Sequence, residues 1–166
     1  MEAGKIAAAA AVVIGLAVAG WYAFGPAEEG AAVRGRLRMF ADEVNGGSTS
    51  GLDPSTRAAR FGAFFTEDAD VDLGQGTAPI RGRATIIGMA ERLQPRTAAF
   101  RLEFEDVTVA MAPGGDSADV HLTAKFIRRS ISTGEQSLDA REFMLGMRRI
   151  GDTWLIARVT AIDTLK

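Results

Sequence analysis

Residues 6–24 form an uninterrupted run without a charged side chain, and this run limits what the chain can fold into more than any other feature. As a helix rising ~1.5 Å per residue it is roughly 28 Å long, which matches the hydrocarbon core of a bilayer. Lys5 precedes the run, and Trp21 and Tyr22 stand near its other end, where amphipathic rings favour the membrane interface. We therefore predict one transmembrane anchor over residues 1–25.

A cleaved signal peptide is the alternative interpretation of this run, because Ala17-Val18-Ala19 fits the small-x-small cleavage pattern. If the run is retained, the positive charge of Lys5 favours a cytoplasmic N-terminus. The rest of the chain, residues 26–166, then forms one domain on the periplasmic or extracytoplasmic side. The expected location is the cytoplasmic (inner) membrane, with a single pass.

Small side chains recur at every fourth position of the predicted anchor, at Ala7, Ala11, Gly15 and Ala19. Such a stripe lets two helix backbones approach closely, which is how helices associate in lipid. We predict that the stripe packs against a transmembrane helix of another subunit. Alanine-rich anchors also produce such stripes without any packing role, so this second explanation stays open.

The composition excludes several classes of function. There is no cysteine, which rules out thiol catalysis, disulfide bonds and cysteine-bound metal. With 19 Lys and Arg against 21 Asp and Glu, the net charge of −2 gives no field that attracts nucleic acid. His121 is the single histidine, and one histidine without cysteine is a poor basis for a zinc site. We expect no metal, no cofactor and no nucleic acid.

Three amphipathic helices are predicted in the first half of the domain. The first covers residues 27–45, where apolar side chains recur on one helix face. The second begins at Asp53-Pro54, an N-cap followed by a first-turn proline, and runs to about Thr66. The third opens at Gly82 and is closed by Pro95.

Strands are predicted at residues 71–73 and then throughout the second half of the domain. There, apolar side chains alternate over residues 100–111, 118–126, 143–147 and 154–162. The parity of the alternation switches near Glu105-Asp106, which predicts a β-bulge and a bent strand. The predicted fold class is α+β: a cone-shaped, curved antiparallel sheet packed on three helices, with a pocket in the mouth of the cone.

Three segments of the domain resemble a known superfamily. Residues 64–71 read FFTEDADV, residues 80–86 read IRGRATI, and residues 151–156 read GDTWLI. They are similar to the SnoaL-like branch of the nuclear-transport-factor-2-like superfamily, which has a cystatin-like α+β fold. The resemblance covers nearly all of the chain after the anchor. It implies a fold and no single activity, because the superfamily includes isomerases, cyclases, dehydratases, binding domains and assembly subunits.

Steroid isomerisation is one activity of this superfamily that can be assessed by comparing aligned catalytic positions. Alignment with their catalytic aspartate places Leu73 of this chain at the base position. Their helix-one tyrosine, an oxyanion donor, falls at Phe40 or Met39. None of these side chains takes up a proton or donates a hydrogen bond, and isomerisation requires both. The resemblance therefore implies that steroid-type isomerisation is absent, and no catalytic residue is assigned.

Three polar side chains are candidates for lining a ligand pocket. Asp72 lies one position beside the aligned isomerase base and is either a pocket residue or a surface residue. His121 lies opposite the apolar side of its strand, and its imidazole titrates near neutral pH. Arg158 shares the parity of Trp154 and Ile156, so it points either into the cone or against a partner. Ordinary charge pairing on the sheet is the competing explanation.

Two functions remain open. The first is a non-catalytic accessory or assembly subunit of a bacterial membrane protein complex, in contact with other membrane-protein subunits and open to homodimerisation through its sheet. The alternative is a membrane-tethered protein that binds a small hydrophobic ligand, or a SnoaL-like enzyme. Aromatic side chains expected inside the cone favour the alternative, because ligand pockets are commonly apolar.

Overall fold

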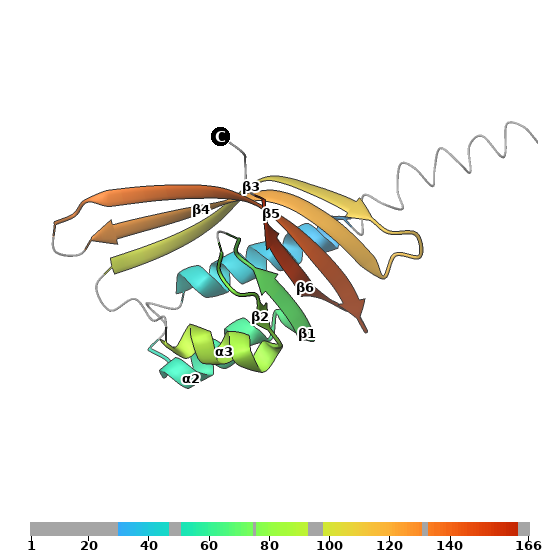
Figure 1. Cartoon of the computed structure of the whole chain (residues 1–166), viewed down its shortest axis with the longest axis horizontal. Helices are drawn as coiled ribbons and strands as arrows, with labels where there is room; N and C mark the ends of the chain where they lie inside the picture. Colours follow the sequence, from blue (N-terminus) through green and yellow to red (C-terminus); the bar gives the residue numbers. More distant parts are fainter. Residues whose placement is uncertain (1–29, 47–50, 75, 93–97, 131–132, 163–166) are drawn as a thin grey trace, which may run out of the picture.

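The computed structural model describes residues 30–46, 51–74, 76–92, 98–130 and 133–162. Within these residues, three helices pack against one face of a curved six-stranded sheet (Figure 1). No helix in this part of the chain is long and apolar enough to span a bilayer. The predicted anchor and its stripe of small side chains lie outside the described residues.

The helices form where capping and apolar spacing predict them. The first helix, over residues 30–46, buries Val33 and Leu37, which lie one turn apart on its sheet-facing side. α2 (Pro54–Gly62) begins after Asp53, whose side chain accepts a hydrogen bond from the N–H of Thr56 at 3.0 Å. α3 (Arg83–Arg92) packs against α2 below the sheet.

The prediction that the second helix runs to about Thr66 is wrong. The helix ends at Gly62, where the N–H of Ala63 bonds back to the carbonyl of Ala59 at 3.1 Å. β1 (Phe65–Asp72) then starts at once, with Phe65 beside Ile156 of the last strand. The aromatic residues in this region recur at spacings of three and four, which imitates a helix, although Phe65 is buried as part of a strand.

The six strands lie in the order β2-β1-β6-β5-β4-β3. The remaining bounds are β2 (Ile80–Arg81), β3 (Ala98–Met111), β4 (Ser117–Ser130), β5 (Gln136–Ile150) and β6 (Thr153–Ala161). β3 to β6 form the predicted antiparallel meander. The expectation of a wholly antiparallel sheet needs correction, because β1 pairs with β6 in parallel. Side-chain alternation marks a strand but carries no information about the direction of its neighbour.

Two irregularities change which way side chains point. The register of β3 against β4 shifts between Glu105 and Thr108, and Asp106 has a φ of 51°. This confirms the predicted bulge. A second shift occurs in β6, where Arg158 pairs with Gly146 and Ile156 pairs with Met147. Ala157 is therefore an extra residue, and side chains after it point to the opposite face from the one expected.

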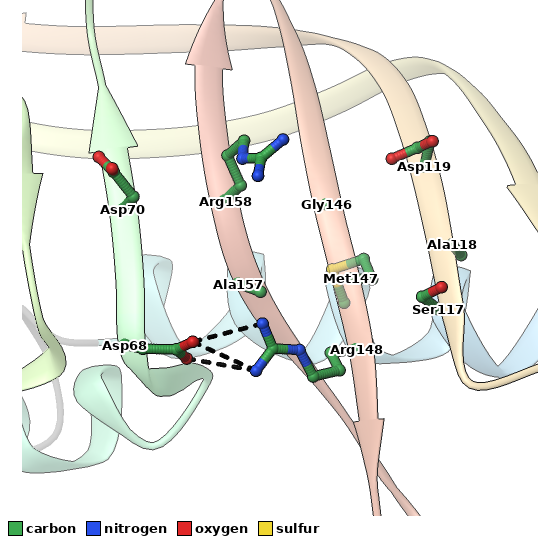
Figure 2. A pocket seen from close by; sticks show the side chains of 10 residues that line it. All are labelled: Asp68, Asp70, Ser117, Ala118, Asp119, Gly146, Met147, Arg148, Ala157 and Arg158. Atoms are coloured by element: carbon green, nitrogen blue, oxygen red, sulfur yellow. Dashed lines mark hydrogen bonds and ion pairs between the residues drawn. The ribbon is translucent and has the colours of Figure 1, made fainter. Parts of the chain in front are cut away.

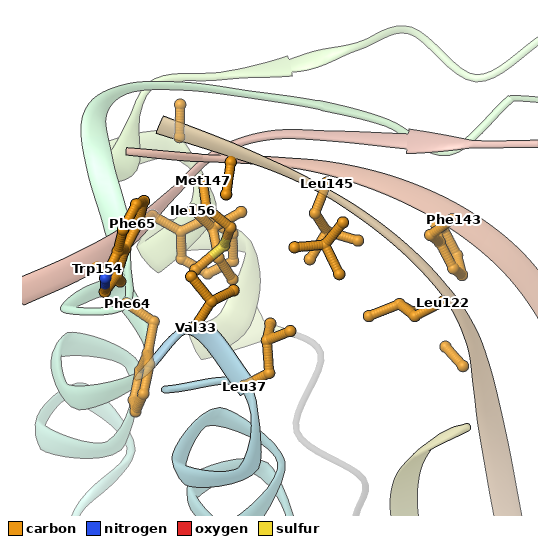
Figure 3. Close-up of a cluster of buried hydrophobic side chains, with 14 of the residues drawn as sticks. Val33, Leu37, Phe64, Phe65, Leu122, Phe143, Leu145, Met147, Trp154 and Ile156 are labelled. Atoms are coloured by element: carbon orange, nitrogen blue, oxygen red, sulfur yellow. The ribbon is translucent and has the colours of Figure 1, made fainter. Parts of the chain in front are cut away.

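The hydrophobic core lies between the helices and what we call the inner face of the sheet. Figure 3 shows Val33 and Leu37 reaching from the first helix toward the sheet side chains. Leu122, Met147 and Ile156 are among the largest fully buried side chains of the sheet. The opposite side, the outer face, is covered by none of the three described helices (Figure 1).

Candidate functional site

An aromatic cluster lies on the inner face of the sheet, between the first helix, α2 and β3. Phe40 stands at its centre, with ring centroids 5.3 Å from Phe61, 5.4 Å from Phe64 and 5.8 Å from Phe65. The ring of Phe104 on β3 stacks on Phe40 at 6.2 Å, with an interplanar angle of 6°. Offset and edge-on contacts of this kind are favourable beyond the area that they bury. The cluster supplies packing and no polar group.

The structure distinguishes the two positions aligned with the isomerase tyrosine. Phe40 faces the core, whereas Met39 is 56% exposed on the far side of the same helix. Leu73, at the aligned base position, follows directly after β1 and is 39% exposed. Neither Phe40 nor Leu73 carries a group that exchanges a proton or donates a hydrogen bond, so this pair cannot perform acid–base chemistry.

The three predicted pocket residues do not meet inside the cone. Asp72 lies beside Thr160, Thr160 beside Met144, and Met144 beside His121, in one row across the strands. This row belongs to the outer face, because its β4 and β5 members alternate with the buried side chains of those strands. Asp72 also accepts the N–H of Gly74 at 2.9 Å, which closes a turn.

Arg158 is on the outer face as well. Strict alternation from Trp154 and Ile156 would point Arg158 inward. The extra residue Ala157 turns the Arg158 side chain to the outer face, where it is exposed. The apolar positions after the bulge shift accordingly, to Val159 and Ala161. That shift from even to odd positions is the sequence signal that identifies the bulge.

A shallow depression of about 370 Å³ lies in the outer face beside Arg158 (Figure 2). Its charged lining residues come from four strands: Asp68, Asp70, Asp119, Arg148 and Arg158. Gly146 creates the hollow, because it has no side chain in the row between β6 and β4. A Cβ at this position would lie 3.4 Å from Cβ of Arg158, in ordinary contact.

Most charges around this depression are already paired. Arg148 leans across β6 to Asp68 at 3.3 Å, and Arg81 lies 3.4 Å from Asp70. The pKa of Asp68 lies below its ordinary value because the Thr66 hydroxyl and the backbone stabilise the carboxylate, with a further contribution from Arg148. These exposed pairs fix side-chain directions more than they add stability.

Arg158 and Asp119, which also line the depression, differ from these residues because they are not ion-paired. Neither side chain has an ion-pair partner within 4.0 Å among the described residues. Figure 2 shows them on either side of Gly146, with Arg158 extending from β6 toward β5 and Asp119 on β4. Among the charged residues that line this depression, Arg158 and Asp119 are therefore one positive and one negative charge without an ion-pair partner, one strand away from β5 on either side.

The neighbouring polar groups on β4 are engaged within the sheet. His121 lies 3.9 Å from Glu142, an ion pair only when the imidazole is protonated. Lys125 binds Glu105 at 2.7 Å, and this hydrogen bond raises the pKa of the lysine. No group of three or more His, Asp or Glu side chains in the described ranges is placed to hold a metal ion.

Large apolar side chains complete the outer face, and the sequence interpretation missed them. Leu138, Met144 and Ile150 are 61%, 49% and 52% exposed. All three lie on β5, with the opposite parity to the buried Phe143 and Leu145. Their even-numbered positions could have identified this face from the sequence. A strand with apolar residues at both odd and even positions has apolar side chains on both of its faces.

Comparison with known proteins identifies the fold. No family model matches the chain, and no curated protein matches it. Solved structures do match, among them a ketosteroid isomerase-like protein from Erwinia carotovora atroseptica, with 17% identity, a TM-score of 0.59, and coverage of 82% of this chain and 98% of that one. ActVI-ORFA from Streptomyces coelicolor matches with 16% identity and a TM-score of 0.65, covering 81% and 97%.

A third structure, Aln2 from a Streptomyces species, matches with 17% identity and a TM-score of 0.65, over 80% of this chain and 88% of that one. At these identities the likeness establishes architecture alone. The domain has the α+β fold of nuclear-transport-factor-2-like, SnoaL-like proteins, with a six-stranded curved sheet and three helices in the described residues.

Proposed function

We propose that this chain is a non-catalytic accessory or assembly subunit of a bacterial membrane protein complex, and that the outer face of its sheet is the docking surface. The observation that carries the proposal is the combination on this face of unmatched charges with exposed apolar side chains. Arg158 and Asp119 supply the charges, and Met144 and Ile150 supply the apolar contact. Protein interfaces combine an apolar centre with such polar groups around it.

The residues at the aligned catalytic positions also support the proposal. Steroid-type isomerisation on this fold would need a base and an oxyanion donor facing a bound substrate. The alignment with the steroid isomerases puts Leu73 at the base position and Phe40 or Met39 at the donor position, and Phe40 is surrounded by four other rings. The proposal assigns the inner face to stability and the outer face to recognition.

The membrane location belongs to the proposal. The uncharged run at residues 6–24 would anchor the chain in the cytoplasmic membrane with the domain on the periplasmic side. Its small residues, Ala7, Ala11, Gly15 and Ala19, would provide a second contact, with a transmembrane helix of another subunit. Single helix contacts in lipid are worth only ~1 kcal/mol, so the folded domain has to contribute most of the binding.

A matched pair of variants tests the proposal. Met144 and Met39 are similarly exposed, at 49% and 56%, but only Met144 is on the outer face. We expect Met144→Asp to shift the full-length protein, extracted in mild detergent, from a large assembly to a smaller one on native gels. Met39→Asp should leave the assembly intact. Equal migration of both variants with the wild type would remove the outer face from the proposed function.

The alternative function, binding of a small hydrophobic ligand, is favoured by one observation. The rings of Phe100 and Phe126 lie 6.0 Å apart on the inner face and are only half-buried. A saturable one-to-one titration with an apolar fluorescent dye, abolished by Phe126→Asp and unaffected by Met144→Asp, would favour this alternative. An absence of saturable binding would contradict this alternative and leave the two rings as packing residues at the edge of the hydrophobic core.

A further inference from the structure

Two arginines on the first helix have no ionic partner in the parts of the chain that the structure describes. Arg34 and Arg38 lie one turn apart on the same side of the helix, and both residues are exposed. Neither guanidinium is within 4.0 Å of a described carboxylate. Arg36, between them, has a structural role, because its guanidinium lies 4.1 Å from the centre of the Phe64 ring and donates to the carbonyl of Ala63 at 3.0 Å.

The arrangement of Arg34 and Arg38 opposes the stability of their own helix. Like charges four residues apart on a helix repel each other. The N-terminal end of a helix is itself partially positive, which disfavours a nearby cation. Arg34 reaches that end, because a Cβ added to Gly30 would lie 3.3 Å from Nη1 of Arg34. A local arrangement that weakens its own element is expected where the residues have a function.

The start of this helix is close in sequence to the uncharged run at residues 6–24. Phe24 and Gly30 are six residues apart, and a chain of that length spans roughly 20 Å when fully extended. Side chains on a helix lean toward its N-terminus, and the contact of Arg34 with the Gly30 position follows that rule. If the run crosses a bilayer, both guanidinium groups lie on the end of the helix that is tied to the membrane surface.

The first helix is held firmly on the sheet, so its direction sets the direction of the whole domain. Val33 and Leu37 are fully or almost fully buried in the core. At the far end of the helix, Asn45 makes two hydrogen bonds to the backbone of Leu102. The end of the domain at which the helix begins (blue in Figure 1) is therefore the end that a membrane anchor would bring nearest to the lipid.

We infer that Arg34 and Arg38 bind the phosphate groups of anionic phospholipids and hold this end of the domain against the membrane surface. The inference rests on the membrane anchoring in the proposed function and adds the lipid surface as a further partner. A guanidinium presents two parallel N–H donors that match the oxygens of a phosphate. Each arginine close to an anionic membrane strengthens binding roughly fivefold.

Full-length protein in lipid nanodiscs tests this contact. The chain contains no cysteine of its own, so an environment-sensitive dye on Ala31→Cys is the only label, at an exposed position three residues before Arg34. In phosphatidylcholine discs with an increasing share of phosphatidylglycerol, we expect a saturable change in emission. Arg34→Gln combined with Arg38→Gln should raise the share needed for the half-maximal change at least about fivefold.

The matched control removes the same two charges elsewhere. Arg128 and Arg129 are exposed near the end of β4, on the opposite side of the domain from the start of the first helix (Figure 1). Their double glutamine variant should leave the half-maximal share unchanged. The variant with glutamine at positions 34 and 38 should melt at or above the wild-type temperature, because it loses a like-charge repulsion. A normal melt excludes misfolding as the cause of weaker lipid binding.

Two further arms identify the chemistry of the contact. Arg34→Lys with Arg38→Lys keeps both charges and should stay within about twofold of the wild type. Glu28 and Glu29 precede the helix in the sequence and oppose an anionic surface, so replacing both by glutamine should lower the half-maximal share. A response to inorganic phosphate in pure phosphatidylcholine discs, without a response to phosphatidylglycerol, would overturn the inference because the ligand would be a free anion.

The remaining outcomes separate this inference from the proposed function. Equal phosphatidylglycerol dependence in the wild type and in both glutamine variants would overturn the inference. If that occurs while Met144→Asp still disrupts the assembly, the proposed function stands alone. If Met144→Asp has no effect and the lipid dependence is as expected, the lipid contact stands and the docking surface fails. Release of the full-length chain from native membranes by alkaline carbonate would contradict the anchor, and the inference would fail with it.

Discussion

The carboxamide of Asn45 binds both backbone groups that Leu102 presents at the open edge of the sheet. The N–H of Leu102 donates to Oδ1 of Asn45 at 2.7 Å, and Nδ2 of Asn45 donates to the carbonyl of Leu102 at 2.9 Å. β3 is an edge strand, so these groups have no neighbouring strand. The contact fastens the end of the first helix to the sheet and blocks strand pairing at this point.

Asn45→Ala should lower the free energy of unfolding by about 1–3 kcal/mol, because two hydrogen bonds are lost and the backbone groups of Leu102 are left to solvent. Denaturant unfolding measures the change. Asp42→Ala is the matched control on the exposed side of the same helix, and it should stay within about 0.5 kcal/mol of the wild type. Equal effects from both variants would show that the Asn45 contact contributes nothing.

Two glycines should respond to alanine in opposite directions. A methyl group at Gly62 would overlap the side chain of Ile87 where α2 packs on α3. Gly62→Ala should therefore destabilise the domain by about 1–3 kcal/mol through overpacking. Gly88 lies inside α3 with nothing within 4 Å of the added methyl, so Gly88→Ala should stabilise by about 0.5–1 kcal/mol. A thermal melt that ranks them in the reverse order contradicts the helix packing described above.

Phe40 should be among the most sensitive positions of the domain. Phe40→Ala removes the ring on which four others pack, and a loss of about 3 kcal/mol in unfolding free energy is expected. Met39→Ala, on the exposed side, should change it by less than about 0.5 kcal/mol. If Phe40→Ala is tolerated as well as Met39→Ala, the cluster does not hold the first helix on the sheet.

Asp53 should contribute an acid-sensitive part of stability. Hydrogen bonds from the side chains of Ser55 and Thr56 hold its pKa well below the ordinary value of 3.8. A carboxylate with a lowered folded-state pKa stabilises fully above the unfolded value, and the contribution is lost as pH falls toward the folded value. Asp53→Asn keeps a cap without this titration. The melting temperature of the wild type should fall relative to Asp53→Asn below about pH 4, with a constant difference above pH 5.

The sequence was most informative where local chemistry decides the structure. The start of α2 follows from Asp53-Pro54, and the bulge in β3 follows from the parity switch at Glu105-Asp106. The antiparallel meander follows from turns and alternation. These features depend on residues close together in the chain, which a sequence pattern records directly.

Features set by distant contacts were harder to predict. The parallel pairing of β1 with β6 joins Phe65 to Ile156 across most of the domain. The orientation of Arg158 depends on the extra residue Ala157, which is small and interrupts the alternation without a glycine or proline to mark it. Arg158 lies on the outer face and not inside the cone because one inserted residue reverses every later side chain of β6.

Labelling of single cysteines in intact membranes tests the central claim, that the outer face is covered in the native assembly. Positions 144 and 39 are comparably exposed in the isolated chain, at 49% and 56%, so any difference in reactivity comes from a partner. In spheroplasts, a membrane-impermeant maleimide should label Met39→Cys rapidly. It should label Met144→Cys at least about tenfold more slowly, until detergent or Arg158→Asp dissociates the assembly. Equal, rapid labelling at both positions in the untreated membrane would contradict the account.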